Sequence, residues 1–187
     1  MENVRDIREK NRIKTLDLVY IAMGAAIIAI CSWISVPTTV PFTFQTFAVF
    51  AMVLTLGGGR GMFATLTYIL LGAVGVPVFA GFTGGIGILL GNTGGYILGF
   101  LFIGLSYHVF TKYFGKKRLV EILALLVGLV ICYAFGTGWF LYIYMRDVGA
   151  VSIMTVLSWC VFPFIIPDLI KMALAFGIAR RIRTVIK

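Results

Sequence analysis

FPFIIPDLIKMALAF, residues 162–176, is apolar almost throughout, yet it contains Asp168 and Lys171 one helical turn apart. A charged residue at the centre of a membrane helix costs about 2.5–3.5 kcal/mol on insertion scales. At a spacing of three residues the two side chains share one helix face and can pair. Such a pair either joins this helix to its neighbours or belongs to a polar binding site. We favour a binding site, because a pair that only packs could be replaced by apolar residues at little loss.

The composition of the chain indicates a membrane protein. Hydrophobic residues make up 60% of the 187 and charged residues 12%, and the mean hydropathy is +1.04. Soluble domains carry about 25% charged residues, so lipid is the expected solvent here. The three cysteines, Cys31, Cys132 and Cys160, all fall within apolar runs, which predicts neither a disulfide framework nor a metal cluster.

Six apolar spans follow one another along the chain. We expect an all-α integral membrane protein, a six-transmembrane-helix bundle, although the second and third spans are short for the roughly 20 residues that a crossing needs. The basic residues 1–16 form a cytosolic segment and residues 17–187 a single membrane domain. The first span is too long for a signal peptide and no cleavage site follows it, so we expect it to be retained. The predicted spans are 18–36, 44–56, 62–76, 91–111, 119–144 and 150–179.

The basic residues predict the orientation of this bundle. Fourteen of the sixteen would lie on one side of a membrane crossed six times. The opposite side would hold only Arg146, and Lys171 lies within a span. By the positive-inside rule both termini are cytosolic. Because the charges are not gathered on one folded face, they do not predict a nucleic-acid partner. The fourteen are Arg5, Arg8, Lys10, Arg12, Lys14, Arg60, Lys112, Lys116, Lys117, Arg118, Arg180, Arg181, Arg183 and Lys187.

Two uncharged loops on the opposite side predict a covered pocket. The first reads SVPTTVPFTFQTF (35–47), and the second, VPVFAGFTGGIGILLGNTGGY (76–96), contains seven glycines from Gly81 to Gly95. Glycine permits close approach of backbone to a ligand or to another helix, so the second loop could form a lid or a flexible connector. The later glycines, Gly91, Gly95 and Gly99, have the spacing of close helix packing.

Pro163 and Pro167 favour a kink beside a polar cavity, since each lacks a backbone donor. Counted from Arg180 at 1.5 Å per residue, Lys171 and Asp168 would lie about 13 and 18 Å from the cytosolic edge, near the midplane. A pocket there would open toward the glycine-rich loop.

The chain lacks the motifs of soluble enzymes. The run from Gly57 to Gly61 has no Lys-Ser/Thr of a P-loop, so no ATPase site is expected. The groups available to a ligand are one carboxylate, one ammonium, and amides and hydroxyls. They predict a small, mostly apolar organic anion or zwitterion, not a metal, a sugar or a resident cofactor. The amide and hydroxyl groups belong to Thr43, Gln45, Thr83, Asn92 and Tyr96.

Three motifs together resemble the BioY family: VPFTFQTF (40–47), LGAVGVPVFAGFTGGIGILLGNTGGYILGF (71–100) and PDLIK (167–171). These proteins are the biotin-specific substrate-binding (S) components of energy-coupling-factor (ECF) vitamin transporters. The resemblance implies six helices, cytosolic termini, a prokaryotic cell-membrane location and biotin held under the two loops. It also implies three partner subunits, a transmembrane coupling protein (T component) and two ABC-type ATPases.

The resemblance further implies that Asp168 and Lys171 contact biotin. A carboxylate can accept from the ureido N–H groups and an ammonium can neutralise the valerate carboxylate, or the lysine can orient the aspartate. Some relatives have asparagine at the position of Thr83, and many have proline at the position of Asn92, so a contact at Thr83 would use its hydroxyl or the backbone. The other residues that we assign to the pocket on this basis are Gln45, Phe79, Gly84, Gly85 and Tyr96.

S components share a small-residue patch on the first helix that meets the coupling protein. Ala22, Ala26 and Ala29 provide it here, although small residues also serve packing within a bundle. Two other functions stay open: an S component for another small vitamin, and an ion-coupled secondary transporter of a small organic acid with Asp168 as its proton site.

Overall fold

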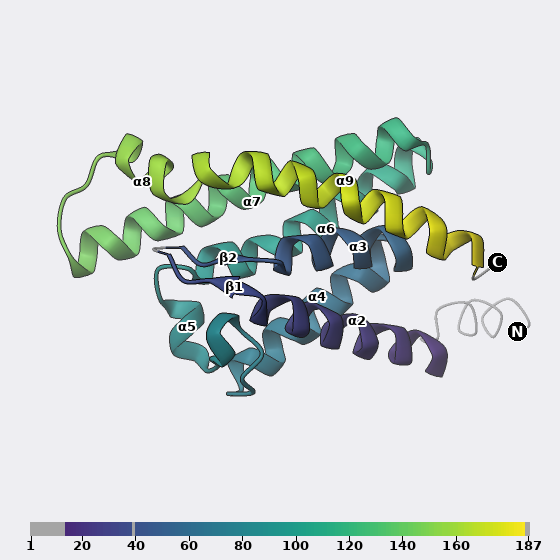
Figure 1. Ribbon diagram of the computed structural model, residues 1–187, viewed down its shortest axis with the longest axis horizontal. Helices are drawn as coiled ribbons and strands as arrows, with labels where there is room; N and C mark the ends of the chain where they lie inside the picture. The colour runs from purple at the N-terminus through teal and green to yellow at the C-terminus, as the bar shows by residue number, and fades with distance from the viewer. Residues whose placement is uncertain (1–13, 39, 186–187) are drawn as a thin grey trace, which may run out of the picture.

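The computed structural model describes residues 14–38 and 40–185, which form a bundle of helices with a small loop layer at one end (Figure 1). The basic segment predicted over residues 1–16 therefore lies mostly outside the described residues, as does Lys187. The long helices are α2 (Thr15–Trp33), α3 (Gln45–Leu56), α4 (Gly58–Ala73), α6 (Gly94–Phe114), α7 (Arg118–Asp147) and α9 (Phe162–Val185). The short elements are β1 (Ser35–Val36), β2 (Phe42–Thr43), the 3-10 turn η1 (Ala80–Phe82), α5 (Ile86–Leu90) and α8 (Ile153–Cys160).

The helical membrane fold expected from composition is confirmed. Four segments are long and apolar enough to cross a membrane: Thr15–Trp33, Gly94–Phe114, Arg118–Asp147 and Ile153–Thr184. Helices α3 and α4, with 12 and 16 residues, are shorter. The count of six crossings and their orientation stay predictions.

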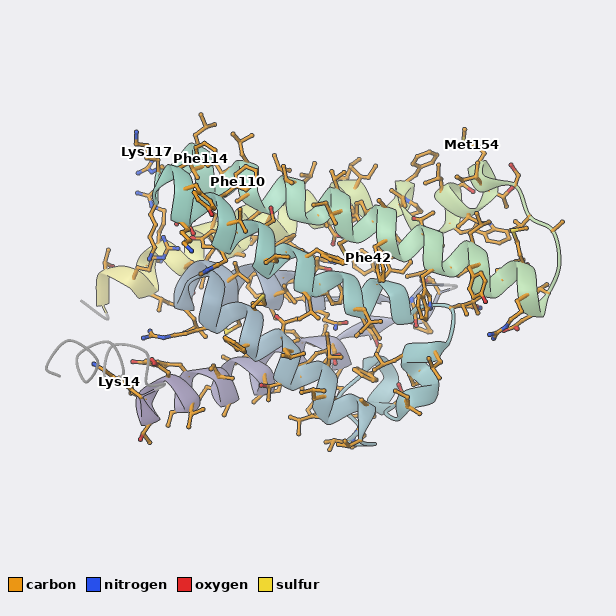
Figure 2. All side chains as sticks on the ribbon, turned by 180° about the vertical axis from the view of Figure 1, so that it is seen from behind. Lys14, Phe42, Phe110, Phe114, Lys117 and Met154 are labelled. Atoms are coloured by element: carbon orange, nitrogen blue, oxygen red, sulfur yellow. The ribbon has the colours of Figure 1, made fainter. Side chains whose placement is uncertain are left out.

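The two ends of the bundle differ in charge. Lys14 and Lys117 lie at one end, where α2 begins and α9 ends, and Met154 lies at the other (Figures 1 and 2). We call these the basic end and the loop end. The loop end also carries β1 and β2, an antiparallel pair with Ser35 opposite Thr43 that the all-α prediction did not include.

Helix α3 is the centre of the bundle. It is apolar on all sides, as a helix without a solvent face must be, and it contacts α2, α4, α6 and α9. From Gln45 to Leu54, every residue except Phe47 is buried. This short and mostly buried helix is therefore the element on which α2, α4, α6 and α9 pack.

The turn between α3 and α4 is tighter than the sequence indicated. The third span was predicted to begin at residue 62, but α4 begins at Gly58, because Gly57 alone reverses the chain at φ +86°. A Cβ atom at Gly61 would lie 2.6 Å from the Cα atom of Val53, so the two helices pack with their backbones in close contact. Arg60 is consequently a helical residue, and its Nη2 atom lies 2.6 Å from Asp17 Oδ1.

The glycine stripe serves helix packing at two of its three positions. A Cβ atom at Gly95 would lie 2.3 Å from the Cβ atom of Trp139, and one at Gly99 would lie 2.8 Å from Cys132 Sγ. The prediction is thus confirmed for these two glycines, which let α6 approach α7. Gly91 precedes α6, and its carbonyl oxygen accepts a hydrogen bond from Trp139 Nε1 at 2.9 Å.

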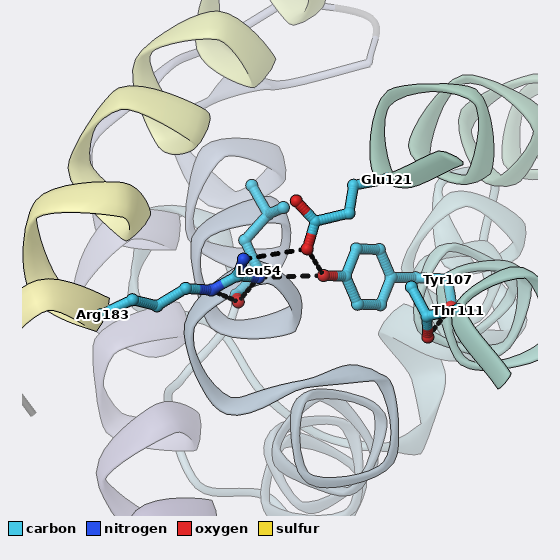
Figure 3. Close-up of polar contacts among 5 residues, drawn as sticks. All are labelled: Leu54, Tyr107, Thr111, Glu121 and Arg183. Atoms are coloured by element: carbon cyan, nitrogen blue, oxygen red, sulfur yellow. Dashed lines mark hydrogen bonds and ion pairs between the residues drawn. The ribbon is translucent and has the colours of Figure 1, made fainter. Parts of the chain in front are cut away.

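A polar cluster joins four helices at the basic end (Figure 3). Arg183 of α9 donates from Nη1 to Glu121 Oε1 at 2.9 Å and from Nε to the carbonyl oxygen of Leu54 at 2.7 Å. Its Nη2 atom donates to Leu54 as well, and to Tyr107 Oη at 2.9 Å. Tyr107 in turn donates to Glu121 Oε1 at 2.5 Å. Because the Glu121 side chain is only 4% exposed, its charge depends on these donors.

Arg183→Met should therefore lower the free energy of unfolding by about 2–4 kcal/mol, since it leaves a buried carboxylate uncompensated. Unfolding of the detergent-solubilised chain measures this. The matched control is Arg181→Met, at an exposed position of the same helix. Adding Glu121→Leu to Arg183→Met should recover part of the loss. Equal effects of the Arg181 and Arg183 substitutions would contradict the structural role of the cluster.

Candidate functional site

A cavity of about 200 Å³ lies at the loop end, between the loops and helices α3, α6, α7 and α9. Its wall is mostly apolar and aromatic, with a smaller number of polar side chains, which is the usual character of a small-molecule site. The lining residues are Val40, Pro41, Thr43, Gln45, Thr46, Phe79, Ala80, Thr83, Ile88, Thr93, Tyr96, Ile97, Phe100, Leu129, Cys132, Tyr133, Cys160, Phe164, Asp168 and Lys171.

The Asp168–Lys171 pair forms the charged part of this wall. Lys171 Nζ lies 2.9 Å from Asp168 Oδ1, and the two side chains are 5% and 3% exposed. The ammonium also donates to the carbonyl oxygen of Thr43 at 2.7 Å and lies 4.2 Å from the centre of the Phe42 ring. The pairing predicted from the spacing is confirmed, and the loop before α3 supplies a second partner for the lysine.

Tyr133 of α7 provides a second donor to the Asp168 carboxylate. Its hydroxyl donates to Asp168 Oδ2 at 2.6 Å, so both carboxylate oxygens have a donor. Tyr133 is not among the site residues predicted from the sequence. The available signal was a tyrosine inside the apolar run VICYAF (130–135), a position where the hydroxyl of a buried residue needs a partner.

Helix α9 begins where it can hold both charges at the cavity. The break between α8 and α9 falls at Val161, two residues before Pro163. A proline in the first turn of a helix loses no hydrogen bond, because that N–H has no helical partner in any case. From there α9 runs unbroken past Pro167, which keeps Asp168 and Lys171 on one face.

Gln45 and Phe79 are linked through Tyr68. Gln45 Nε2 donates to Tyr68 Oη at 3.0 Å, and the Tyr68 and Phe79 rings meet edge to face with centroids 5.5 Å apart. A Cβ atom at Gly72 would lie 2.0 Å from Phe79 Cζ, so glycine at this position makes room for the ring. Both predicted residues thus line the cavity with a common buried support.

The predicted glycine-rich lid covers the cavity through residues 77–83, which we call the lid segment. Phe79, Ala80 and Thr83 line the cavity. Within the segment Phe79 N donates to the carbonyl oxygen of Thr83 at 2.9 Å, and Thr83 Oγ1 donates to that of Ala80 at 2.9 Å. The Thr83 hydroxyl is thereby tied to the backbone of its own loop.

Six of the nine predicted ligand residues line the cavity: Gln45, Phe79, Thr83, Tyr96, Asp168 and Lys171. Gly84, Gly85 and Asn92 do not. A Cβ atom at Gly84 would lie 2.4 Å from the carbonyl oxygen of Val76. Gly85 has φ +101° and donates from N to Gly72 O at 2.7 Å. These two glycines shape the loop, and it is Thr93, the neighbour of Asn92, that reaches the cavity.

The predicted partner patch on α2 is only partly at the surface. Ala22 and Ala26 are exposed, but Ala29 is 6% exposed and belongs to the core cluster that includes Val78. The assignment of Ala29 to an exposed patch is therefore wrong. The reason is that Ala29 packs into the core of the bundle, which the spacing of small residues along one helix cannot show.

The cavity carries groups suited to holding a small molecule, namely a compensated ion pair and aromatic side chains. Among residues 14–38 and 40–185, no group of three His, Cys, Asp or Glu side chains could hold a metal ion. The cysteines of the described chain are all free, and Cys132 and Cys160 line the cavity. A buried cavity with one compensated ion pair, in a bundle of apolar helices, defines a membrane protein that binds a small molecule.

Comparison with known proteins identifies the family. The model of the BioY family matches residues 7–187, and the chain belongs to this family, as its motifs indicated. The biotin transporter BioY of Thermotoga maritima is 39% identical over 169 residues, which cover 89% of this chain and 95% of that one. The probable biotin transporter BioY of Pyrococcus horikoshii is 38% identical over 174 residues, covering 91% and 98%.

The fold has a solved counterpart. A crystal structure of the S-component for biotin from an ECF-type ABC transporter superposes with a TM-score of 0.80 at 25% sequence identity. The match covers 92% of this chain and 95% of that one. The bundle and its loop layer are therefore those of an S component.

Lys171→Met should lower the free energy of unfolding by about 3–5 kcal/mol, because it leaves the Asp168 carboxylate buried without its counter-charge. Chemical unfolding of the protein in micelles measures the change. The control Lys112→Met, at an exposed position of α6, should change stability by less than about 0.5 kcal/mol. A cost below 1 kcal/mol at Lys171 would mean that the pair is not compensating a buried charge.

Proposed function

We propose that this chain is a high-affinity biotin-binding S component that mediates biotin uptake across the cell membrane as part of an ECF-type transporter. The observation that carries the proposal is the buried Asp168–Lys171 pair in the wall of a lidded cavity, in a chain whose relatives are named biotin transporters. The chain supplies binding, and partner ATPases supply the energy.

The ion pair is the proposed site for the ureido ring of biotin. Lys171 already has Asp168 as its counter-ion and Thr43 as an acceptor, so a second carboxylate would meet an ammonium whose charge is compensated. A neutral ureido group suits the pair better: its N–H groups donate to Asp168, and its carbonyl oxygen accepts the remaining N–H of Lys171. Tyr133 holds the carboxylate in place for this contact.

The rest of the cavity suits the remainder of the molecule. Phe79, Tyr96, Phe100 and Phe164 provide aromatic walls for the sulfur-containing ring and the aliphatic chain. The valerate carboxylate would then lie away from the pair, toward the hydroxyl group of Thr93. The predicted roles of Gly84 and Gly85 become those of loop geometry, and Asn92 has no contact role in this proposal.

Neither alternative function has a specific observation in its favour. A proton-coupled transporter would need Asp168 to exchange a proton, but both of its oxygens are held by donors from Lys171 and Tyr133. An S component for another vitamin would share the fold, and the ligand panel described below separates it from a biotin protein.

The proposal includes a membrane orientation and partners. The basic end faces the cytosol, with six crossings in the prokaryotic cell membrane and both termini inside. A transmembrane coupling protein packs on the exposed face of α2 around Ala22 and Ala26. Two ABC-type ATPases bind that partner in turn.

Biotin should raise the apparent unfolding temperature of the detergent-solubilised protein, because a ligand that binds only the folded state stabilises it by mass action. At a thousandfold excess over the dissociation constant the gain is about 4 kcal/mol, or roughly 10 °C for a chain of this size. Riboflavin and thiamine at equal concentrations should have little effect. No shift with biotin would refute the proposed ligand, and a shift with another vitamin would replace it.

A triple substitution separates binding from packing. Asp168→Leu/Lys171→Met/Tyr133→Phe removes the whole network together, which for buried ion pairs is often nearly neutral for stability. We expect a folded protein whose biotin affinity is lower by about 100-fold or more, since at least two charge-assisted hydrogen bonds are lost. The buried but remote Ser106→Ala serves as the control with unchanged affinity. Full biotin affinity in a folded triple variant would show that the pair is only structural.

A further inference from the structure

The lid segment contacts α2 through residues that do not line the cavity. Trp33, the last residue of α2, donates from Nε1 to the carbonyl oxygen of Pro77 at 3.0 Å. Its ring stacks on that of Phe82, with centroids 5.0 Å apart and an interplanar angle of 24°. The two ends of the lid segment are thus both held by one side chain.

A second contact comes from the preceding residue. Ser32 Oγ lies 2.5 Å from the carbonyl oxygen of Val78 and 2.7 Å from that of Ala29. A hydroxyl has one hydrogen to donate, so Ser32 can donate to only one of these two carbonyl oxygens at a time. In these contacts Trp33 Nε1 donates to a single acceptor, the carbonyl oxygen of Pro77, so Trp33 is the more specific connection between α2 and the lid segment.

The conformation of Phe82 indicates that contacts with α2 keep the lid segment in place. Phe82 has φ +57°, the only positive φ of a non-glycine residue in the described chain. A side chain in the left-handed region is disfavoured and persists where surrounding contacts determine it. Phe82 is 65% exposed, and the aromatic contact of its ring is the stack on Trp33.

We propose that Trp33 is a positioning residue that keeps the lid closed, and that it sets the rate at which ligand enters and leaves the cavity. This inference rests on the proposed function for the identity of the ligand. Trp33 touches no cavity atom, so its contacts act on the free and the loaded protein alike. Its loss therefore speeds entry and exit together and changes affinity much less.

The position of Trp33 also couples the lid to the membrane-facing side of α2. The exposed Ala22 and Ala26 lie on the same unbroken helix, and Ala26 is about 10 Å from Trp33 along its axis. Ala29, which lies between Ala26 and Trp33, is buried. A partner that packs on Ala22 and Ala26 and shifts α2 would thus move the residue that holds the lid.

The test compares exchange rates of labelled biotin in nanodisc-embedded full-length protein. Trp33→Ala should raise both the association and the dissociation rate roughly 10- to 100-fold, since a hydrogen bond and an aromatic stack are lost. Trp33→Phe, which keeps the stack, should raise both about 3- to 10-fold. The affinity should stay within about threefold in both. The control is Tyr142→Ala, an exposed aromatic residue of α7 that does not line the cavity, with rates within about twofold.

A ligand-independent readout makes the test decisive. Cys132 and Cys160 line the cavity and are each 1% exposed, so their reaction with N-ethylmaleimide reports lid opening. Peptide mass spectrometry should find both thiols modified at least several-fold faster in the two Trp33 variants than in Tyr142→Ala. Unchanged thiol rates, or a higher biotin dissociation rate without faster association, would overturn the inference. If the unsubstituted protein does not bind biotin, the proposed function fails while the thiol rates still decide the role of Trp33.

Discussion

The structure depends on one constraint, that hydrocarbon does not tolerate an uncompensated charge. Asp168 and Lys171 can be buried only because α9, α7 and the chain before α3 meet at one place and supply each other with partners: a carboxylate, a phenol and a backbone carbonyl. The position of the cavity follows from this, since the network fixes where these three segments approach.

The same physics places the short helix α3. Two cations of α9 donate to backbone carbonyl oxygens at the two ends of α3. Lys171 donates to Thr43, just before α3, and Arg183 donates to Leu54, in the last turn of α3. The two cations are about 18 Å apart along α9, and their acceptors lie just before α3 and in its last turn, so α9 runs along the length of α3. A mostly buried helix too short to span a membrane by itself is in this way fixed at both ends.

Much of this could be predicted from the sequence, and the limits have physical causes. Composition and the i, i+3 spacing of Asp168 and Lys171 are local properties, so the membrane class and the pair were accessible. Tyr133 was not, because its contact with Asp168 joins residues 35 positions apart. The early start of α4 depends on one residue, Gly57, adopting positive φ. Ala29 was misjudged because helix periodicity describes a helix alone, whereas the burial of Ala29 depends on how α2 packs in the bundle.

The cavity combines a site without net charge and a lid held from outside. The two charged residues that line the cavity within the described residues, Asp168 and Lys171, are paired with each other. The binding free energy of a ligand therefore depends more on the direction of its hydrogen bonds than on its charge. This favours a ligand with a defined polar group over any small anion. Orientation of that kind requires the wall to stay in place while the ligand is bound. Trp33 holds the lid segment without taking part in ligand binding, because its hydrogen bond and its stack are made with Pro77 and Phe82, which do not line the cavity. Affinity and exchange rate are therefore determined by different residues, and each can change without the other.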